Sequence, residues 1–324
     1  MPRLAQVAII VSLVFNAGVS TNASVVAEFA GSNSHLFFTA GNRIYSYDRS
    51  TSALEYFDAS GLGDVSLREL AFDDDNNLYA ACFGGSNVGI LKFARDGQSV
   101  SNFVPKTSDE EYWGIAFDNS GDLYASQGDV IRKFDITGAL LAELNDTRLD
   151  EPRGLAFDTQ GHLLIANSGG SEVLIYDDTF NYLGEVSLTT HVWGIAVKPD
   201  GRVYVASGNQ GNFINVYAAS FSFLSTISHA DLTEPAQVAF DDAGSLFASS
   251  TNLPKLVVFD ASDDYSTSLN GAFPHSLGVA FDRITADPFV LPTAAVPEVP
   301  GGITSVVVAT AGVLYRRRTS NLTR

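Results

Sequence analysis

A four-residue motif recurs six times along the chain and constrains its fold more than any other feature. The motif reads aliphatic-Ala-Phe-Asp, as in residues 115–118 and 155–158, and one copy reads Ile-Ala-Val-Lys at 195–198. Its central alanines lie at positions 71, 116, 156, 196, 239 and 280, so successive copies are 40 to 45 residues apart. A period of this length is typical of repeat architectures, in which each unit packs against its neighbours.

Each copy of the motif is followed by the same succession of short segments. A polar turn with a glycine, such as residues 119–122, suits a β-hairpin. A second strand follows at 123–126, a third strand ends in an aromatic residue at 130–134, and a fourth covers 140–144. Four short antiparallel strands at this period form one blade of a β-propeller. We therefore predict an all-β, six-bladed propeller.

The two ends of the repeat region predict how the ring closes. An extra second and third strand, residues 35–39 and 43–48, precede the first motif, whereas no such strands follow the sixth motif at 279–282. The C-terminal first strand should therefore pair with the N-terminal second strand in a shared blade. Such closure removes free sheet edges. One propeller over residues 26–282 replaces the two domains that the length of 324 residues would otherwise suggest.

The repeat resembles the NHL family and its wider six-bladed relatives, which include gluconolactonase-like lactonases. The nearest copy is Glu-Pro-Arg-Gly-Leu-Ala-Phe-Asp at 151–158, continuing through Gly161 to Asn167. The resemblance implies the fold and leaves the activity open. The lactonase relatives hold a calcium ion with Glu, Asn and Asp side chains around the channel. That ligand set has no residue-by-residue match in this sequence.

The N-terminal segment has the pattern of a secretory signal peptide. Arg3 precedes an apolar run over residues 4–15, and small and polar residues follow as far as Ala23. A short apolar core after a positive charge, with a small-residue exit, is typical of such signals. We expect residues 1–23 to be removed after Ala23, with cleavage after Ala27 as a second option. An N-terminal anchor or a buried helix is the alternative.

The C-terminal segment resembles the PEP-CTERM sorting tail of exported bacterial proteins. A Pro-rich linker over residues 283–300 contains Pro297 and Glu298 and leads into an apolar run at 303–315. The basic cluster Arg316, Arg317 and Arg318 follows the run. Thirteen helical residues span about 20 Å, which is short of the roughly 30 Å of a hydrocarbon core. The resemblance implies that an exosortase cleaves residues 301–324 from the protein, whereas an unprocessed membrane tether is the alternative.

Charge and cysteine content exclude several classes of function. The formal net charge of -18 disfavours nucleic-acid binding, which needs a basic face. The single cysteine, Cys82, excludes an intramolecular disulfide and is expected to be a buried structural thiol rather than a nucleophile. An acidic, closed ring of this kind is expected to be a monomer.

One register of the repeat carries candidate metal ligands. Five residues before each central alanine lie Ser66, Glu111, Glu151, His191, Glu234 and His275. Carboxylates and imidazoles can bind a divalent metal or act as acid and base. Glu111, Glu151, His191, Glu234 and His275 are therefore candidate metal ligands at the channel mouth. The alternative is that they are turn and capping residues spread around the rim.

A second register carries a candidate ligand-binding patch. Three residues before the alanine lie Trp113, Arg153 and Trp193, with Arg68, Ala236 and Leu277 in the other blades. An indole–guanidinium–indole patch could bind a sugar, an anion or an aromatic ligand. Strand alternation instead favours core packing, because it places Trp113 on the same face as Ile115. Gly114, Gly154 and Gly194 follow on the opposite parity and would let neighbouring blades approach closely.

Together, these features favour an exported propeller that binds a protein, a peptide or an extracellular polysaccharide. No catalytic residue is assigned, and no cofactor is implied except for the possible divalent metal. The alternative is a metal-dependent, gluconolactonase-like hydrolase or lyase with its site at the channel mouth.

Overall fold

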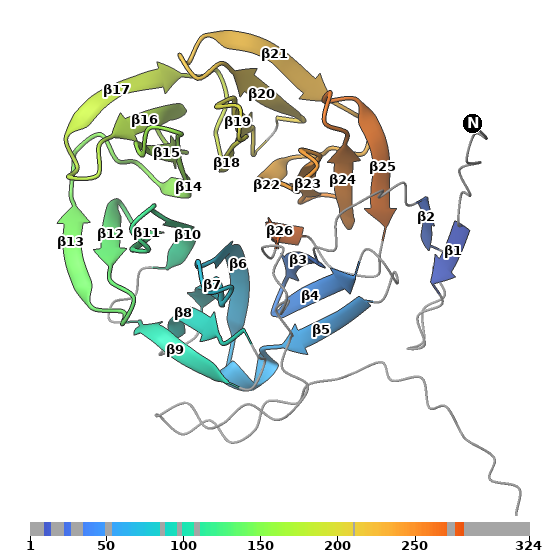
Figure 1. Ribbon diagram of the computed structural model, residues 1–324, viewed down its shortest axis with the longest axis horizontal. Coiled ribbons are helices and arrows are strands. Elements are labelled where there is room, and N and C mark those ends of the chain that lie inside the picture. Colours follow the sequence, from blue (N-terminus) through green and yellow to red (C-terminus); the bar gives the residue numbers. More distant parts are fainter. Residues whose placement is uncertain are drawn as a thin grey trace, which may run out of the picture.

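The computed structural model describes residues 10–13, 23–26, 35–48, 54–84, 88–95, 99–106, 111–209, 211–270 and 276–281. Six four-stranded antiparallel sheets form a ring, with the first strand of each sheet at the centre and the fourth at the rim (Figure 1). This arrangement confirms the predicted all-β, six-bladed propeller. The described residues contain only one short helix, the 3-10 helix η1 (Ser60–Leu62).

In each blade the strands pair in order from the innermost strand outward to the rim. The closing blade contains β26 (Ser276–Phe281), β3 (His35–Ala40), β4 (Arg43–Asp48) and β5 (Leu54–Asp58). Blade 1 contains β6 (Val65–Phe72), β7 (Leu78–Gly84), β8 (Val88–Phe93) and β9 (Val100–Pro105). Blade 2 contains β10 (Tyr112–Phe117), β11 (Leu123–Gln127), β12 (Val130–Phe134) and β13 (Leu140–Leu144). Blade 3 contains β14 (Pro152–Phe157), β15 (Leu163–Asn167), β16 (Glu172–Tyr176) and β17 (Tyr182–Ser187). Blade 4 contains β18 (Gly194–Val197), β19 (Val203–Ala206), β20 (Phe213–Tyr217) and β21 (Phe223–Ser228). Blade 5 contains β22 (Pro235–Phe240), β23 (Leu246–Ser250), β24 (Lys255–Phe259) and β25 (Tyr265–Asn270).

The ring closes as the sequence predicts. Strand β26 pairs with β3, so that Phe281 lies opposite Leu36 and Val279 lies opposite Phe38. Residues from opposite ends of the repeat region thus share one sheet, and no blade is left with an unpaired inner strand (Figure 1).

A β-bulge interrupts the inner strand of five blades at the same place. In β10 the register shifts between Tyr112 and Ile115, and the equivalent shift occurs in β6, β14, β22 and β26. The sixth inner strand, β18, begins only at Gly194. A bulge adds one residue to a strand and re-aims the side chains before it. Alternation therefore cannot be carried across this point of the repeat.

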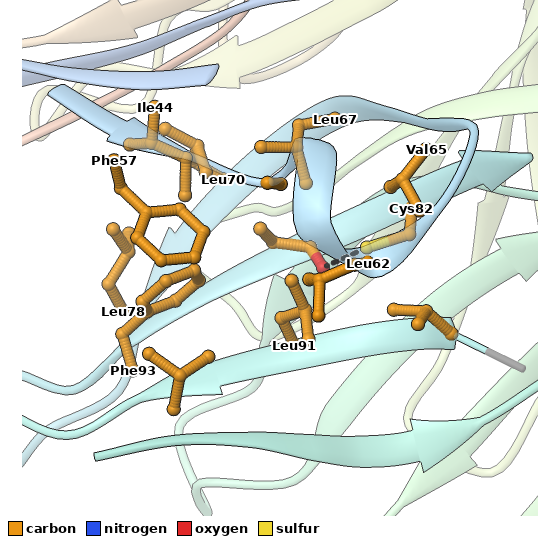
Figure 2. Close-up of a cluster of buried hydrophobic side chains, with 14 of the residues drawn as sticks. Ile44, Phe57, Leu62, Val65, Leu67, Leu70, Leu78, Cys82, Leu91 and Phe93 are labelled. Carbon is orange, nitrogen blue, oxygen red and sulfur yellow. Dashed lines mark hydrogen bonds between the residues drawn. The ribbon is translucent and has the colours of Figure 1, made fainter. Parts of the chain in front are cut away.

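Hydrophobic side chains fill the seams between adjacent blades. The seam between the closing blade and blade 1 contains Ile44, Phe57, Leu78 and Phe93, and the rings of Phe57 and Phe93 meet edge to face (Figure 2). Cys82 is buried in the same cluster, and burial raises the pKa of its thiol to about 12. The expectation of a structural thiol is confirmed.

The recurring aspartate of the motif closes the hairpin that follows it. One carboxylate oxygen of Asp158 accepts hydrogen bonds from the main-chain N–H groups of Gln160 and His162, at 2.8 and 2.9 Å. Gly161 completes this turn with a φ of 85°, a left-handed conformation that favours glycine. Asp118 and Gly121 repeat the arrangement in the preceding blade. Part of the acidity of the chain is therefore structural.

The segments expected to be a signal peptide and a sorting tail lie mostly outside the described residues. Within residues 1–34, only β1 (Ile10–Leu13) and β2 (Ala23–Val26) are described, and they form a two-stranded antiparallel sheet. The sorting residues Pro297, Glu298, Arg316, Arg317 and Arg318 all fall in the undescribed range 282–324. None of the described segments is a helix with the length and apolar character needed to span a membrane.

Candidate functional site

A pocket of about 370 Å³ opens at the centre of the ring, where the inner strands begin. We call this side of the propeller the pocket face, and the side that carries the turns between first and second strands the hairpin face. The pocket is lined by Gly41, Ser66, Arg68, Glu69, Trp113, Arg153, Gly154, Trp193, Ala236, Gln237 and Thr251. Its volume falls within the range of about 300–1,000 Å³ that is typical of small-molecule sites.

Arginines and tryptophans alternate along one wall of this pocket. The guanidinium carbon of Arg68 lies 4.6 Å from the ring centre of Trp113, and that of Arg153 lies 4.5 Å from the same ring. Arg153 also lies 4.7 Å from the ring of Trp193. We call these four side chains the guanidinium–indole ladder. They come from the equivalent position of blades 1 to 4, so the patch predicted at Trp113, Arg153 and Trp193 is assembled and extends to Arg68.

Trp113 lies in the middle of the ladder. Strand β10 contacts β6 on one side and β14 on the other, so the guanidinium groups of Arg68 and Arg153 flank the indole. The ring of Trp193 is closely covered by Gly208, where an added Cβ would lie 2.0 Å from an indole carbon. Because the faces of the indoles are covered in this way, a ligand would meet their edges and the N–H groups of the arginines.

The expectation that the tryptophans belong to the blade-to-blade core is wrong. Neither Trp113 nor Trp193 belongs to any of the six hydrophobic clusters among the described residues, and both are half-buried. The physical reason for Trp113 is the bulge between Tyr112 and Ile115, which breaks the alternation that would have placed Trp113 beside Ile115. The side chain lines the pocket, and its ring also meets that of Phe83 in blade 1 edge to face, with 5.1 Å between the ring centres.

The glycines next to the ladder behave as the sequence predicts. A Cβ on Gly114 would lie 2.0 Å from the carbonyl oxygen of Arg153, and one on Gly154 would lie 2.6 Å from that of Trp193. The N–H of Gly154 donates to the Trp193 carbonyl at 2.8 Å. Inner strands of neighbouring blades therefore touch through their backbones.

Hydroxyl groups on second strands hold the two arginines of the ladder in place. The Ser126 hydroxyl accepts from the N–H of Gly114 and donates to the carbonyl of Arg153, both at 2.8 Å. Thr39 does the same between Gly278 and Arg68, both at 2.7 Å. The backbone under each guanidinium is thus fixed by the neighbouring blade.

Both guanidinium groups are short of partners. The Nε atoms of Arg68 and Arg153 are buried without a hydrogen-bond partner, and no acidic side chain of the described residues forms an ion pair with Arg68. Arg153 has one contact of 3.3 Å with Glu151, whose side chain is 65 % exposed. Burial lowers the pKa of Arg68 to about 10, and the charge of Arg153 adds to the effect. Burial likewise lowers the pKa of Arg153.

Glu69 and Gln237 meet at the centre of the ring, across the channel. The side-chain amide of Gln237 donates to a carboxyl oxygen of Glu69. Glu69 keeps some exposure to the pocket, but the protein atoms around its carboxyl group raise its pKa well above the ordinary value. Hydrogen bonds from the Ile115 N–H and from Gln237 oppose this shift without cancelling it. The base of the pocket is therefore a carboxyl group whose negative charge is disfavoured by burial.

The candidate metal ligands are engaged separately around the rim. Glu111 pairs with Lys106 at 2.8 Å and accepts from the N–H of Gly84. Glu151 contacts Arg153, while His191 is exposed and its Nδ1 lies 2.7 Å from the Ser168 carbonyl oxygen. Glu234 lies near the hydroxyl of Thr251, at 3.5 Å, and His275 falls outside the described residues. The described part of the chain contains no group of three or more His, Cys, Asp or Glu side chains arranged to hold a metal.

Sequence reasoning did not single out Arg68, Glu69 or Gln237 as site residues. Arg68 shares the register of Trp113 and Arg153, and that register was the available signal. Glu69 and Gln237 occupy the next position, where the four other blades have Gly114, Gly154, Gly194 and Gly278. Blades 1 and 5 therefore place a long polar side chain in the channel, at the position where the other blades have glycine.

The comparisons with known proteins place the fold among other propellers. No family model matches the chain, and neither does any curated protein. A protein of unknown function from Bacteroides caccae superposes with a TM-score of 0.63 at 15% identity, over 78% of this chain and 100% of that one. A streptogramin B lyase gives 0.59 at 15% identity, over 79% and 92% of the two chains. A gluconolactonase from Xanthomonas campestris gives 0.55 at 19% identity, over 67% and 83%.

These likenesses concern the architecture. At identities below 20% they show that the chain shares the propeller fold with enzymes and with proteins of unknown function.

Proposed function

We propose that the protein is an exported β-propeller that binds a ligand in its central pocket and serves as an interaction scaffold at the cell surface or outside the cell. The expected ligands are a protein, a peptide or an extracellular polysaccharide. The observation that carries the proposal is the guanidinium–indole ladder, because it places two guanidinium groups with only one ion-pair partner between them, among the described residues, at the wall of an open pocket. Hydrogen bonds from charged donors of this kind are stronger than those between neutral groups.

The binding role can be tested with the protein's own fluorescence. The chain has two tryptophans, and both of them line the pocket. A ligand that enters the pocket should change their emission, so titration of the full chain with neutral and acidic oligosaccharides and with peptides reports occupancy directly. Calorimetry on the same solutions provides the control for absorption by the ligand. The absence of both an emission change and binding heat across this panel would contradict a binding role for the pocket.

Export and sorting form the second part of the proposal. The signal-like segment before Ala23 and the PEP-CTERM-like tail after Pro297 support it. Mass spectrometry of the protein from the cell surface should find an N-terminus at Ser24 or Glu28 and the loss of the C-terminal arginines. Surface protein that still ends at Arg324 would argue against processing of the tail and for a retained tether.

A metal-dependent hydrolase or lyase is the rival function. It would need ligands such as Glu111, Glu151 and His191 to converge, whereas each of them is held by its own local partners. Metal analysis of the purified full chain separates the two functions. A stoichiometric divalent ion that is lost when these three residues are replaced together would favour the enzyme.

A further inference from the structure

The two walls of the central pocket differ in chemistry. The guanidinium–indole ladder from blades 1 to 4 forms one wall. Blade 5 and the closing blade form the other, with Ala236, Gln237, Thr251 and Gly41. This wall carries a hydroxyl and an amide and contributes no charged residue to the pocket lining, although the Glu234 carboxylate lies 3.5 Å from the Thr251 hydroxyl. A ligand that fits both walls has an anionic group on one side and hydrogen-bonding hydroxyls on the other.

The local charge of the pocket is opposite in sign to that of the whole protein. Arg68 and Arg153 contribute two cations, and Glu151, whose side chain is largely exposed, contacts Arg153. Glu111 pairs with Lys106, and burial raises the pKa of Glu69 well above its ordinary value, which disfavours a negative charge at the base of the pocket. The ladder taken together with Glu151 therefore carries one uncompensated positive charge, within a chain of net charge -18. A singly charged anion balances it better than a dianion such as a phosphate monoester.

Guanidinium groups suit a carboxylate in geometry as well as in charge. The planar fork of an arginine matches the two oxygens of a carboxylate, and charge-assisted hydrogen bonds of this kind are stronger than neutral ones. Arg68 and Arg153 both line the pocket, and of the two only Arg153 has an ion-pair partner among the described residues, Glu151 at 3.3 Å. Because the indole faces are already covered by the guanidinium groups and by Gly208, stacking of a neutral sugar ring on a tryptophan face is disfavoured.

We infer that the pocket binds a uronic acid residue, with its carboxylate at the pocket-facing edge of the ladder, attracted by both Arg68 and Arg153, and its ring hydroxyls towards Gln237 and Thr251. This inference rests on the proposed binding function and narrows its ligand to an acidic saccharide. The uronate can be a free sugar acid or the terminal residue of an acidic polysaccharide, since both present the same chemical group.

The test compares ligands that differ only at the carboxylate. Titration of the full chain with D-glucuronate, its methyl ester and D-glucose should show glucuronate binding at least about tenfold more tightly than the two neutral sugars, as expected for a hydrogen bond to a charged group. This comparison uses the native protein and does not depend on any variant. Equal binding of the neutral sugars would overturn the uronate assignment and leave the binding function intact.

Variants of the ladder provide the second arm. Arg68→Gln and Arg153→Gln should each weaken glucuronate binding about tenfold or more. Arg132→Gln is the matched control, because Arg132 pairs with Glu143 at 2.8 Å on the outer strands of blade 2, outside the pocket lining. Unchanged glucuronate affinity in both ladder variants would overturn the inference. Circular dichroism of each variant shows whether the fold is retained.

A third arm distinguishes the two sources of the acid. A galacturonate trimer should bind more tightly than monomeric galacturonate if the natural ligand is the end of a polysaccharide. The trimer and the monomer should bind equally tightly if the natural ligand is a free sugar acid. Glucose 6-phosphate is the dianionic competitor. If it binds more tightly than glucuronate, the assignment to a carboxylate is wrong.

Discussion

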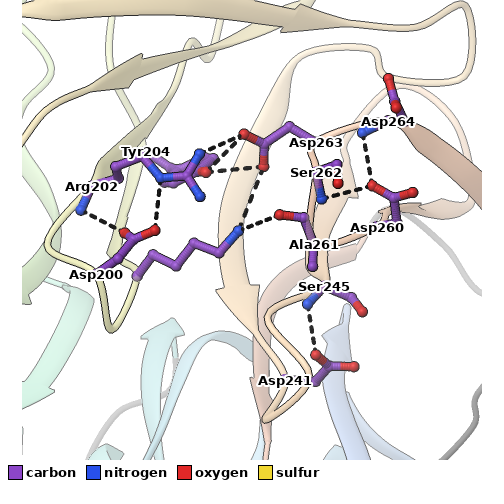
Figure 3. Close-up of polar contacts among 11 residues, drawn as sticks. Asp200, Arg202, Tyr204, Asp241, Ser245, Asp260, Ala261, Ser262, Asp263 and Asp264 are labelled. Carbon is purple, nitrogen blue, oxygen red and sulfur yellow. Dashed lines mark hydrogen bonds and ion pairs between the residues drawn. The ribbon is translucent and has the colours of Figure 1, made fainter.

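Basic side chains on the hairpin face and in the central pocket occupy contrasting surroundings. On the hairpin face, Asp263 accepts ion pairs from Arg202 at 3.1 Å and from Lys198 at 3.9 Å, and its two oxygens accept from the hydroxyl of Tyr204 (Figure 3). Arg202 also pairs with Asp200 at 2.9 Å, and Lys198 donates to the Ala261 carbonyl at 2.8 Å. These cations join the turns of blades 4 and 5.

The residues that line the central pocket show no equivalent arrangement, although elsewhere on the same face Lys106 pairs with Glu111 and Lys255 pairs with Asp231. Arg68 lies between aromatic rings, 4.4 Å from Phe83 and 4.6 Å from Trp113, with its Nε unpartnered. Cation–π contacts stabilise such a side chain by about 0.5–2 kcal/mol, but they do not satisfy its N–H groups. The cations of the hairpin cluster thus have acidic partners, whereas in the pocket Arg68 has none among the described residues and Arg153 has a single contact of 3.3 Å with Glu151. The proposed binding role requires this difference.

The largest expected effect is the loss of the paired cluster. Asp263→Ala leaves Lys198, Arg202 and Tyr204 without their shared acceptor, and we expect it to lower the free energy of unfolding by about 2–4 kcal/mol. Chemical denaturation measures this loss. Asp264→Ala, at the exposed neighbouring position, should change stability by less than about 0.5 kcal/mol. Equal effects of the two substitutions would mean that the cluster does not stabilise the ring.

The next effect concerns the backbone contacts under the ladder. Gly114→Ala introduces a Cβ 2.0 Å from the Arg153 carbonyl oxygen, and Gly154→Ala introduces one 2.6 Å from that of Trp193. Overpacking of this kind typically costs about 1–3 kcal/mol. We expect the Gly114 variant to be the less stable of the two by thermal denaturation. The reverse order would show that the inner strands can move apart freely.

A smaller effect on stability, paired with a large effect on binding, would sharpen the contrast between the faces. Arg68→Gln removes a buried charge that lacks an anionic partner, so the desolvation that it relieves offsets the lost cation–π contacts. We expect its free energy of unfolding to change by less than about 1 kcal/mol while ligand affinity falls. A loss of stability as large as that of Asp263→Ala would assign Arg68 to the fold instead.

The smallest expected effect is a change in pH dependence at the base of the pocket. Burial raises the pKa of Glu69 above its ordinary value of 4.5, so the native state holds a proton that the unfolded chain has released. Stability contributed by this proton is present below pH 4.5 and declines as the pH rises towards the raised pKa. Glu69→Gln should remove this decline and be at least as stable as the native protein at neutral pH. Parallel melting-temperature curves for the two proteins between pH 4.5 and 8 would contradict it.

The sequence was sufficient for the architecture because each blade repeats the same local rules. The Ala-Phe-Asp motif combines an inner-strand core residue with an aspartate that caps the following turn, and this pair fixes both the strand and its hairpin. The extra strands at the N-terminal end and the extra first strand at the C-terminal end then required the pairing of β26 with β3. Local rules and ring closure agree, which is why the prediction holds.

The site was predicted only in part, since two of its determinants are not local. Trp113, Arg153 and Trp193 were found from their shared register, but their direction depends in part on the bulge in the inner strands, which hydrophobic alternation does not show. The pairing of Glu69 with Gln237 joins positions 168 residues apart and exists only because the ring brings blades 1 and 5 to one channel. The expected convergence of Glu111, Glu151 and His191 could not be judged without the local partners that hold each of them.

The seam that closes the ring also determines how the disc can be presented. Strand β26 runs from the pocket face to the hairpin face, and β3 runs back from Leu36, opposite Phe281, to Gly41 at the pocket. The chain therefore joins and leaves the propeller on the hairpin face. Any segment that follows Phe281 starts on the side of the disc opposite the central pocket.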